Sequence, residues 1–282
     1  MQHTVYTMDA RLRILALVTN IPGPLAAAAL ARDGAQVVKV EPPAGDPLAA
    51  ASPTWYDAIT RGIDVVRLDL RQAEARTRLQ ALLARSDLLI TAMRAGALER
   101  LGLSWPQVHE RHPRLCHVAI VGEAAPNDDR AGHDLTYQAQ AGLVRPPAMP
   151  QSVFADLFAA ERAAAAAYRA LFERSQTARG VRIEVAIANG AAQLADPLRY
   201  GLTGANGPLG GGLPVYRLYK SSDGWIALAA LEAHFQARLS EALELETLDV
   251  EALTACFAQH PDAYWENLAR RHDLPLCAVE SV

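Results

Sequence analysis

The stretch "RILALVTNIPGPLAAAALARDGAQVVKVE", residues 13–41, decides the fold. Two short apolar runs, residues 13–18 and 36–41, flank an alanine-rich segment that suits a helix. Strands joined by a helix run parallel, because the helix carries the chain back to the edge of the sheet from which it started. Pro24 near the start of the expected helix and Gly34 near its end occupy positions that these residues favour. The stretch therefore predicts a β-α-β unit.

The same alternation continues through the first two thirds of the chain. Apolar runs at residues 87–91, 114–122 and 180–188 predict further strands, and residues 96–103 and 156–175 predict helices. Short strands separated by helices are typical of α/β proteins. We therefore expect an open, Rossmann-like parallel sheet with flanking helices.

The character of the sequence changes near Gly201. Residues 203–212 are a glycine-rich linker, and residues 215–231 have the pattern of a hairpin with a Ser-Asp-Gly turn. Short helical segments follow. We expect a large α/β domain over residues 1–200 and a small hairpin-and-helix domain over residues 201–282.

Composition argues against several classes of protein. The chain has 282 residues, a formal net charge of -4 and three cysteines without paired spacing. It lacks the basic field of a nucleic-acid binder, and no apolar run approaches the roughly 20 residues that span a bilayer. The N-terminus does not read as a signal peptide. We expect a cytoplasmic protein with neither a nucleic-acid nor a membrane partner, and the spacing of a metal site is absent.

Three ionisable residues stand where helices are expected to begin: His133, Asp156 and Glu232. Each has a simple structural explanation. The helix dipole stabilises a carboxylate such as Asp156 in a first turn whatever its function, a lone histidine is more often structural, and Glu232 suits a helix start. Periodicity alone therefore indicates an α/β protein and favours an enzyme without choosing a reaction.

A series of motifs runs through the chain in order: "GPLAAAALARDGAQVVKVEPPAGDP", "RLDLR", "GALERLGL", "PRLCHVAIVG", "AGHDLTYQAQAGL", Asp156 and "VYRLYKSSDGWIALAALEAHF". Nearly end to end, this series resembles the class III CoA-transferase (CaiB/BaiF) family. The "GHD" motif, the later aspartate and "ALE-x-x-F" resemble its α-methylacyl-CoA racemase branch. Transferase members usually carry a bulkier aromatic residue in place of His133 and a glutamine in place of Ile21, which also favours the racemase.

The resemblance implies that His133 and Asp156 are the catalytic pair and that Glu232 supports the histidine. The hydrogen next to a thioester carbonyl is weakly acidic, so inversion of the α-carbon of a 2-methylacyl-CoA needs a base on one face and an acid on the other. A histidine and a carboxylate suit these roles. Backbone N–H groups at the start of the Asp156 helix would stabilise the enolate oxygen.

Two other functions stay open. In a CoA-transferase, the same Asp156 would attack the thioester carbonyl and form an aspartyl-CoA anhydride that a second carboxylic acid resolves. A non-catalytic acyl-CoA binder is the third class, because the chain departs from the family pattern. Pro42 replaces the usual basic residue, "LFAAER" follows Asp156 where glycines are common, and the C-terminal segment that returns to the large domain in relatives is missing.

The resemblance also implies how the substrate binds. Coenzyme A would enter as part of the thioester substrate, without a separate cofactor, and would lie at the strand ends of the large domain. The two arginines among the matched positions suit its phosphates, although a solvated helix charge explains Arg71 equally well. Relatives form interlocked dimers, so we expect a homodimer. The matched CoA-contact positions are Asn20, Ile21, Leu68, Arg71, Ala92, Met93, Arg100, Asp134 and Tyr137.

Overall fold

The computed structural model describes residues 11–128 and 130–280. The chain divides into two compact units, the first ending at Leu194 and the second beginning at Ala195. The strands of the first unit are β1 (Arg13–Leu17), β2 (Gln36–Glu41), β3 (Asp64–Arg67), β4 (Leu88–Thr91), β5 (Cys116–Val121) and β6 (Arg182–Ala186). Its helices are α1 (Pro22–Arg32), α2 (Pro47–Ala51), α3 (Pro53–Thr60), α4 (Ala73–Leu83), α5 (Ala95–Arg100), α6 (Trp105–Arg111), α7 (Asp134–Ala141), α8 (Phe154–Thr177) and α9 (Ile187–Leu194).

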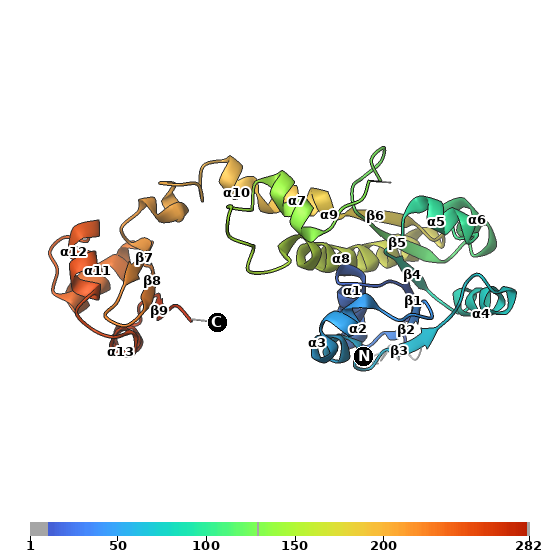
Figure 1. The fold of residues 1–282 in the computed structure, drawn as a ribbon, viewed down its shortest axis with the longest axis horizontal. Helices are drawn as coiled ribbons and strands as arrows, with labels where there is room; N and C mark the ends of the chain where they lie inside the picture. Colours follow the sequence, from blue (N-terminus) through green and yellow to red (C-terminus); the bar gives the residue numbers. More distant parts are fainter. Residues whose placement is uncertain (1–10, 129, 281–282) are drawn as a thin grey trace, which may run out of the picture. The chain divides into compact units, whose positions relative to one another are not determined.

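The six strands form one parallel sheet in the order β3-β2-β1-β4-β5-β6 (Figure 1). This order confirms the predicted open, Rossmann-like parallel sheet. The direction of winding reverses between the central strands β1 and β4. Such a reversal leaves a crevice at the carboxyl ends of the strands, where open α/β sheets bind their ligands.

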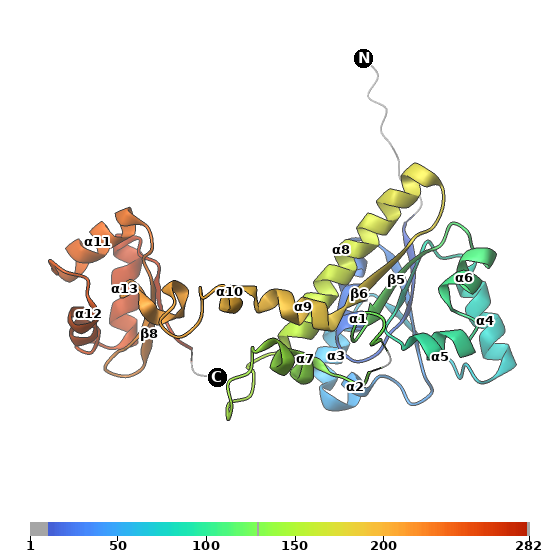
Figure 2. The same ribbon diagram turned by 90° about the horizontal axis from the view of Figure 1, so that it is seen from above.

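Helices cover both faces of this sheet (Figure 2). Along β1, Ile14 and Ala16 belong to the core shared with α1, α3 and α8, whereas Leu15 and Leu17 belong to the core shared with α4, α5 and α6. Successive residues of a strand point to opposite faces, so a strand that is covered on both sides must be apolar throughout. This burial explains the unbroken apolar run at the start of the chain's first β-α-β unit.

Helix α8 spans 24 residues, and the side chains that it buries in the core are mainly alanines. The small side chains let the helix lie close to α1, which turns its own alanines toward the same core. Asp156 lies in the first turn of α8, as predicted, and the helix begins two residues before it. The buried alanines of α8 are Ala155, Ala159, Ala160, Ala163, Ala164, Ala166, Ala167 and Ala170.

The second unit contains the predicted hairpin. Strands β7 (Tyr216–Lys220) and β8 (Trp225–Ala229) pair antiparallel, and β9 (Leu276–Ala278) adds a third strand next to β8. The core of this unit is mainly aliphatic and contains three aromatic side chains that contact one another, Tyr219, Phe257 and Trp265. Its helices are α10 (Asp196–Arg199), α11 (Ala233–Leu243), α12 (Val250–Phe257) and α13 (Asp262–His272).

Two segments differ from their predicted form. The predicted strand over residues 180–188 ends at Ala186, because the backbone N–H of Ala188 donates to the carbonyl of Gly122 and the chain turns into α9. The glycine-rich segment over residues 203–212 is folded and not extended. It coils through backbone hydrogen bonds and ends in a short helical turn, η1 (Pro208–Gly212), since glycine permits close contact between backbone segments.

Among the described residues, no helix is both long enough and apolar enough to cross a membrane.

A buried histidine makes the stability of the first unit depend on pH. His117 of β5 is 1% exposed, and its Nε2 lies 2.9 Å from Thr91 Oγ1. Burial lowers the pKa of the imidazole to about 3, with a smaller effect from the Arg182 charge.

We predict that this histidine makes the first unit acid-sensitive. An unfolded histidine binds a proton near pH 6.5, so the contribution of His117 is fully present above that pH and is lost as pH falls toward 3. In chemical denaturation measured between pH 7 and pH 4, His117→Gln should show a shallower loss of stability than the wild type. The exposed His234→Gln should behave as the wild type, and equal slopes for all three proteins would contradict the prediction.

Candidate active site

Three cavities open at the carboxyl edge of the parallel sheet. The central cavity, of about 160 Å³, is lined by residues that follow β4 and β5 and by His133, Tyr137 and Asp156. The strand-end cavity, of about 550 Å³, lies at the carboxyl ends of β1, β2, β3 and β4. The loop cavity, of about 500 Å³, lies between α2 and residues 149–153. All three lie at the crevice that the strand order creates.

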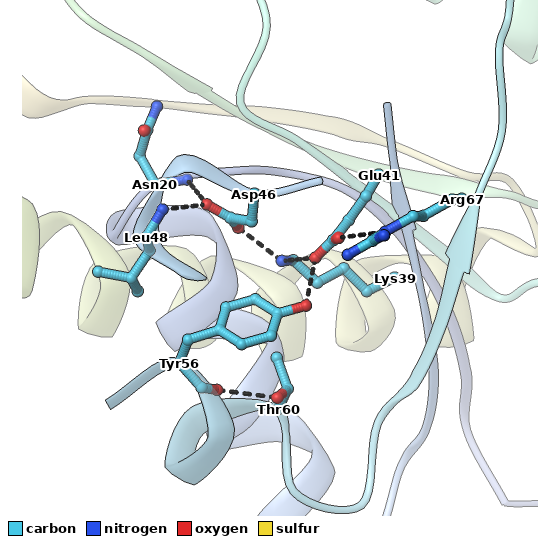
Figure 3. A network of polar contacts seen from close by, with 8 residues as sticks. All are labelled: Asn20, Lys39, Glu41, Asp46, Leu48, Tyr56, Thr60 and Arg67. Carbon is cyan, nitrogen blue, oxygen red and sulfur yellow. Dashed lines mark hydrogen bonds and ion pairs between the residues drawn. The ribbon is translucent and has the colours of Figure 1, made fainter. Parts of the chain in front are cut away.

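A buried ion cluster shapes the loop between β1 and α1 (Figure 3). Lys39 is fully buried, and its Nζ lies 2.6 Å from both Glu41 Oε1 and Asp46 Oδ2. The other oxygen of Asp46 accepts the backbone N–H groups of Asn20 and Leu48, at 2.9 and 3.0 Å. A buried charge is tolerated when such partners surround it. The cluster therefore anchors Asn20, which has a left-handed backbone (φ 68°) and lines the central and loop cavities.

Glu41 receives further contacts in the same cluster. The hydroxyl of Tyr56 donates to Glu41 Oε1 at 2.6 Å, and the Nε atom of Arg67 lies 3.8 Å from Glu41 Oε2. Burial and the adjacent carboxylate raise the pKa of Tyr56, so its hydroxyl stays a donor. These contacts join β2, β3 and α3 beneath the wall of the strand-end cavity, which Glu41 itself lines.

A second carboxylate links α7 to α8. Asp134 is 7% exposed; its Oδ1 accepts the backbone N–H of Asp156 at 3.0 Å, and its Oδ2 accepts the side-chain amide of Gln138 at 2.6 Å. The same amide of Gln138 also donates to the carbonyl of Ser152. Asp134 therefore fixes the first turn of α8 relative to α7.

This contact bears on one detail of the predicted oxyanion site. We predict that backbone N–H groups at the start of α8 stabilise the enolate oxygen. One of these groups, the N–H of Asp156, already donates to Asp134. That group is therefore occupied, and the role of the helix start stays a prediction.

Among the carboxyl groups at these cavities, that of Asp156 has the pKa shifted furthest toward neutral pH. It is 9% exposed and lines both the central and the loop cavities. Burial raises the pKa of its carboxyl group to about 7, and the nearby negative charge of Asp134 adds to the effect. Near neutral pH the group is therefore divided between its ionised and protonated forms.

His133 lies immediately before α7 and lines the same two cavities as Asp156. Its backbone is fixed locally: its N–H donates to Thr136 Oγ1 at 3.0 Å, and the Thr136 hydroxyl donates back to the His133 carbonyl at 2.7 Å. The side chain is exposed toward the cavities. The structure thus brings together the two residues that we predicted as the catalytic pair.

Glu232, the third predicted residue, belongs to the second unit. It is exposed and directly precedes α11. Its role beside His133 stays a prediction of the family resemblance.

Most of the predicted CoA contacts gather at the three cavities. Leu68 and Arg71 line the strand-end cavity, and the exposed Arg71 forms a two-pronged ion pair with Asp69. Arg100 is exposed at the end of α5 and does not line these cavities. The other predicted contacts that line at least one cavity are Asn20, Ile21, Ala92, Met93, Asp134 and Tyr137.

Sequence reasoning missed two arginines that line the central cavity, Arg94 and Arg130. Arg94 directly follows Ala92 and Met93 at the end of β4, and this adjacency was the available signal. Arg130 opens the segment that leads to His133, and its guanidinium lies 3.6 Å from Glu123. Both place a positive charge at the central cavity.

The fold and the site define a Rossmann-like α/β protein whose ligand cavities lie at the reversal of strand order. In the part of the chain that the structure describes, no cluster of three potential metal ligands occurs. A sequence model for CoA-transferase family III matches residues 10–282, so the chain belongs to this family, as predicted.

Relatives in the family include enzymes of both kinds considered above. The succinyl-CoA–D-citramalate CoA-transferase of Chloroflexus aurantiacus is 29% identical over 93% of this chain and 70% of its own length. The alpha-methylacyl-CoA racemase of Homo sapiens is 30% identical over 80% of this chain and 62% of its own length. Since the two identities are nearly equal, the relatives do not choose between racemase and transferase.

Solved structures support the fold. The crystal structure of a hypothetical protein from Mycobacterium tuberculosis matches with a TM-score of 0.80 and 25% identity, over 96% of this chain and 83% of that one. A CaiB/BaiF family protein from Brucella suis matches with a TM-score of 0.78 and 24% identity, over 96% of this chain and 83% of that one.

We predict that the fold is strongly destabilised when the buried ion cluster loses its cation. Lys39→Met would leave two carboxylates buried without their cation, and breaking a buried pair in this way typically costs about 3–5 kcal/mol. The matched control is Arg169→Met, which breaks a solvent-exposed Arg169–Glu173 pair on α8. Urea unfolding should show a large loss for the first variant and less than about 1 kcal/mol for the second. Similar losses for both variants would contradict this role of the cluster.

Proposed function

We propose that this protein is an acyl-CoA racemase that inverts the α-carbon of a 2-methylacyl-CoA. One observation carries the proposal: the imidazole of His133 and the carboxyl group of Asp156 line the same cavities, and the pKa of Asp156 is raised to about 7. A carboxyl group with this pKa exists in both forms at neutral pH. It can therefore remove a proton from one stereoisomer and return a proton to the other.

The reaction uses the two residues in opposite roles. With one stereoisomer, ionised Asp156 takes the α-proton and protonated His133 supplies a proton to the other face of the planar enolate. With the mirror-image substrate, neutral His133 is the base and protonated Asp156 is the acid. Each turnover leaves the pair in the protonation state that the reverse reaction needs.

The strand-end cavity offers a place for coenzyme A. It is the largest of the three cavities, and it shares Thr19, Ala92 and Met93 with the central cavity. A CoA moiety in the strand-end cavity would therefore present its thioester to His133 and Asp156 in the central one. Arg71 at the strand-end cavity is suited to the phosphates, because guanidinium groups form paired contacts with phosphate oxygens.

A CoA-transferase is the second candidate, and the 29% identity to a transferase over 93% of the chain favours it. In that reaction Asp156 attacks the thioester carbonyl, expels the CoA thiolate and forms an acyl anhydride. A nucleophilic carboxylate must be ionised, so this reaction would use the ionised part of the Asp156 population. A homodimeric state, expected from the family resemblance, and a cytoplasmic location, expected from the composition, accompany either candidate as predictions.

Solvent exchange tests the proposal directly. In D₂O, the wild type should introduce deuterium at the α-carbon of either stereoisomer of a 2-methylacyl-CoA. His133→Ala should abolish racemisation and retain exchange with only the stereoisomer that Asp156 deprotonates, whereas Asp156→Asn should retain exchange with only the other. The exposed His234→Ala on α11 is the control and should match the wild type. A wild type that shows no α-exchange but forms a hydroxylamine-trappable acyl group on Asp156 would establish the transferase instead.

The two stereoisomers should also differ in their pH dependence. The rate for the stereoisomer deprotonated by Asp156 should fall as pH decreases below about 7, because the carboxylate becomes protonated. The rate for the other stereoisomer requires protonated Asp156 and should fall as pH rises above about 7. Profiles of kcat/KM measured separately for each stereoisomer check this expectation. If the Asp156-dependent change in kcat/KM instead occurred near pH 4 with both stereoisomers, burial would not raise the pKa of Asp156.

A further inference from the structure

The hydroxyl group of Tyr137 lies at the central cavity without a hydrogen-bond partner among the described residues. Tyr137 is only 3% exposed, and its ring packs with Ala155 of α8 and Ala191 of α9. It nevertheless lines the central cavity together with His133 and Asp156. Within residues 11–128 and 130–280, its hydroxyl makes no hydrogen bond, and only burial and neighbouring charges perturb its pKa.

Two glycines make room for this hydroxyl. A Cβ atom placed on Gly122, which follows β5, would lie 2.2 Å from the Tyr137 hydroxyl oxygen, and one placed on Gly132 would lie 2.4 Å from it. Both distances are far below van der Waals contact. The hydroxyl therefore occupies a narrow space between two backbone segments, and both glycines line the central cavity.

Two other tyrosines use their hydroxyl groups within the protein. The hydroxyl of the buried Tyr219, which is 2% exposed, donates to the carbonyl of Pro214 at 2.7 Å. The hydroxyl of the half-buried Tyr56 donates to Glu41. The Tyr137 hydroxyl is not one of the fully enclosed polar atoms without a partner, so it opens onto the central cavity that Tyr137 lines. Its hydrogen-bond partner is therefore solvent or a ligand in that cavity.

The chemistry at this cavity requires a hydrogen-bond donor. Removal of the α-proton places negative charge on the thioester oxygen, and this charge must be stabilised in a site that excludes water. The backbone N–H of Asp156 is already used by Asp134. Burial and the carboxylates of Glu123 and Asp156 raise the pKa of Tyr137 against the opposing effect of Arg94, so the phenol remains protonated and able to donate.

We propose that Tyr137 is a catalytic residue whose hydroxyl donates a hydrogen bond to the thioester oxygen of the bound acyl-CoA. The proposal rests on the acyl-CoA chemistry proposed above and assigns its oxyanion stabiliser to a side chain. The proton stays on the phenol throughout, and no covalent bond to Tyr137 forms or breaks. The hydrogen bond strengthens as the oxygen becomes an enolate, or a tetrahedral oxyanion in the transferase reaction, so it lowers the barrier more than it tightens binding.

The primary test is Tyr137→Phe, which keeps the buried ring and removes only the hydroxyl. We expect kcat for α-deuterium exchange and racemisation to fall by about 10²–10³-fold, as when an oxyanion donor is lost, while KM changes by less than about threefold. Tyr219→Phe is the matched control, because it also removes the hydroxyl of a buried tyrosine, and it should retain wild-type kcat. A Tyr137→Phe variant with kcat within about threefold of the wild type would overturn the proposal.

A double-mutant cycle tests the position of the hydroxyl. Gly122→Ala should lower kcat because its methyl group displaces the hydroxyl. In the Tyr137→Phe background the same change should have little further effect, since the nearest remaining ring atom, Cζ, lies 3.3 Å from the added Cβ. Equal effects of Gly122→Ala in both backgrounds would show that the glycine serves backbone folding and would contradict the assignment.

The failure of this proposal is distinguishable from the failure of the proposed function. If the wild type catalyses acyl exchange and not α-exchange, the racemase assignment fails, but Tyr137→Phe must still reduce acyl exchange by a similar factor. If the wild type is active in either assay and Tyr137→Phe is equally active, the tyrosine assignment alone is wrong. A wild type inactive in both assays, with 2-methylacyl-CoA and with carboxylic acid acceptors, would refute both.

Discussion

The ammonium group of Lys39 is buried between two carboxylates, and the geometry of the crevice depends on this arrangement. A lysine at the centre of a β-strand would be unfavourable without compensation, and Glu41 and Asp46 provide it from the same strand and from the loop that follows. Because Asp46 also accepts two backbone N–H groups, it ties the loop after β1 to the start of α2. The walls of all three cavities include residues held by this cluster or adjacent to it.

A second constraint acts on the other side of the crevice, where one carboxylate supports another. Asp134 holds the first turn of α8 through the backbone of Asp156 and at the same time places a negative charge near its side chain. The same contact therefore performs structural and electrostatic tasks. The residue that positions the proposed catalytic carboxylate, Asp156, also helps to bring its pKa toward neutrality.

The open parallel sheet could be predicted from the sequence because parallel strands that are buried on both faces leave an uninterrupted apolar signal, whereas the order of its strands was not predicted. The proposed catalytic pair followed from the motifs of the family resemblance. The buried ion cluster could not be predicted from the sequence. Lys39 and Glu41 look like ordinary polar positions of a strand, and only the folded chain places Asp46 next to Lys39. The niche around Tyr137 was missed for the same reason, because Gly122, Gly132 and Tyr137 belong to segments that meet only in the folded chain. The coiled form of the glycine-rich segment was also hidden, since glycine permits extended and compact backbones alike.

The alanines of α8 have a consequence for the precision of the site. An alanine side chain has no rotamers, so the buried face of this helix cannot rearrange by changing side-chain torsions. The position of the helix that carries Asp156 is therefore set by close backbone packing and not by side chains that can change rotamer. Thermal displacement of the carboxylate is restricted to its own torsions and to movement of the whole helix. Larger hydrophobic residues would fill the same space with more conformers, and would leave the proton-transfer distance less sharply defined.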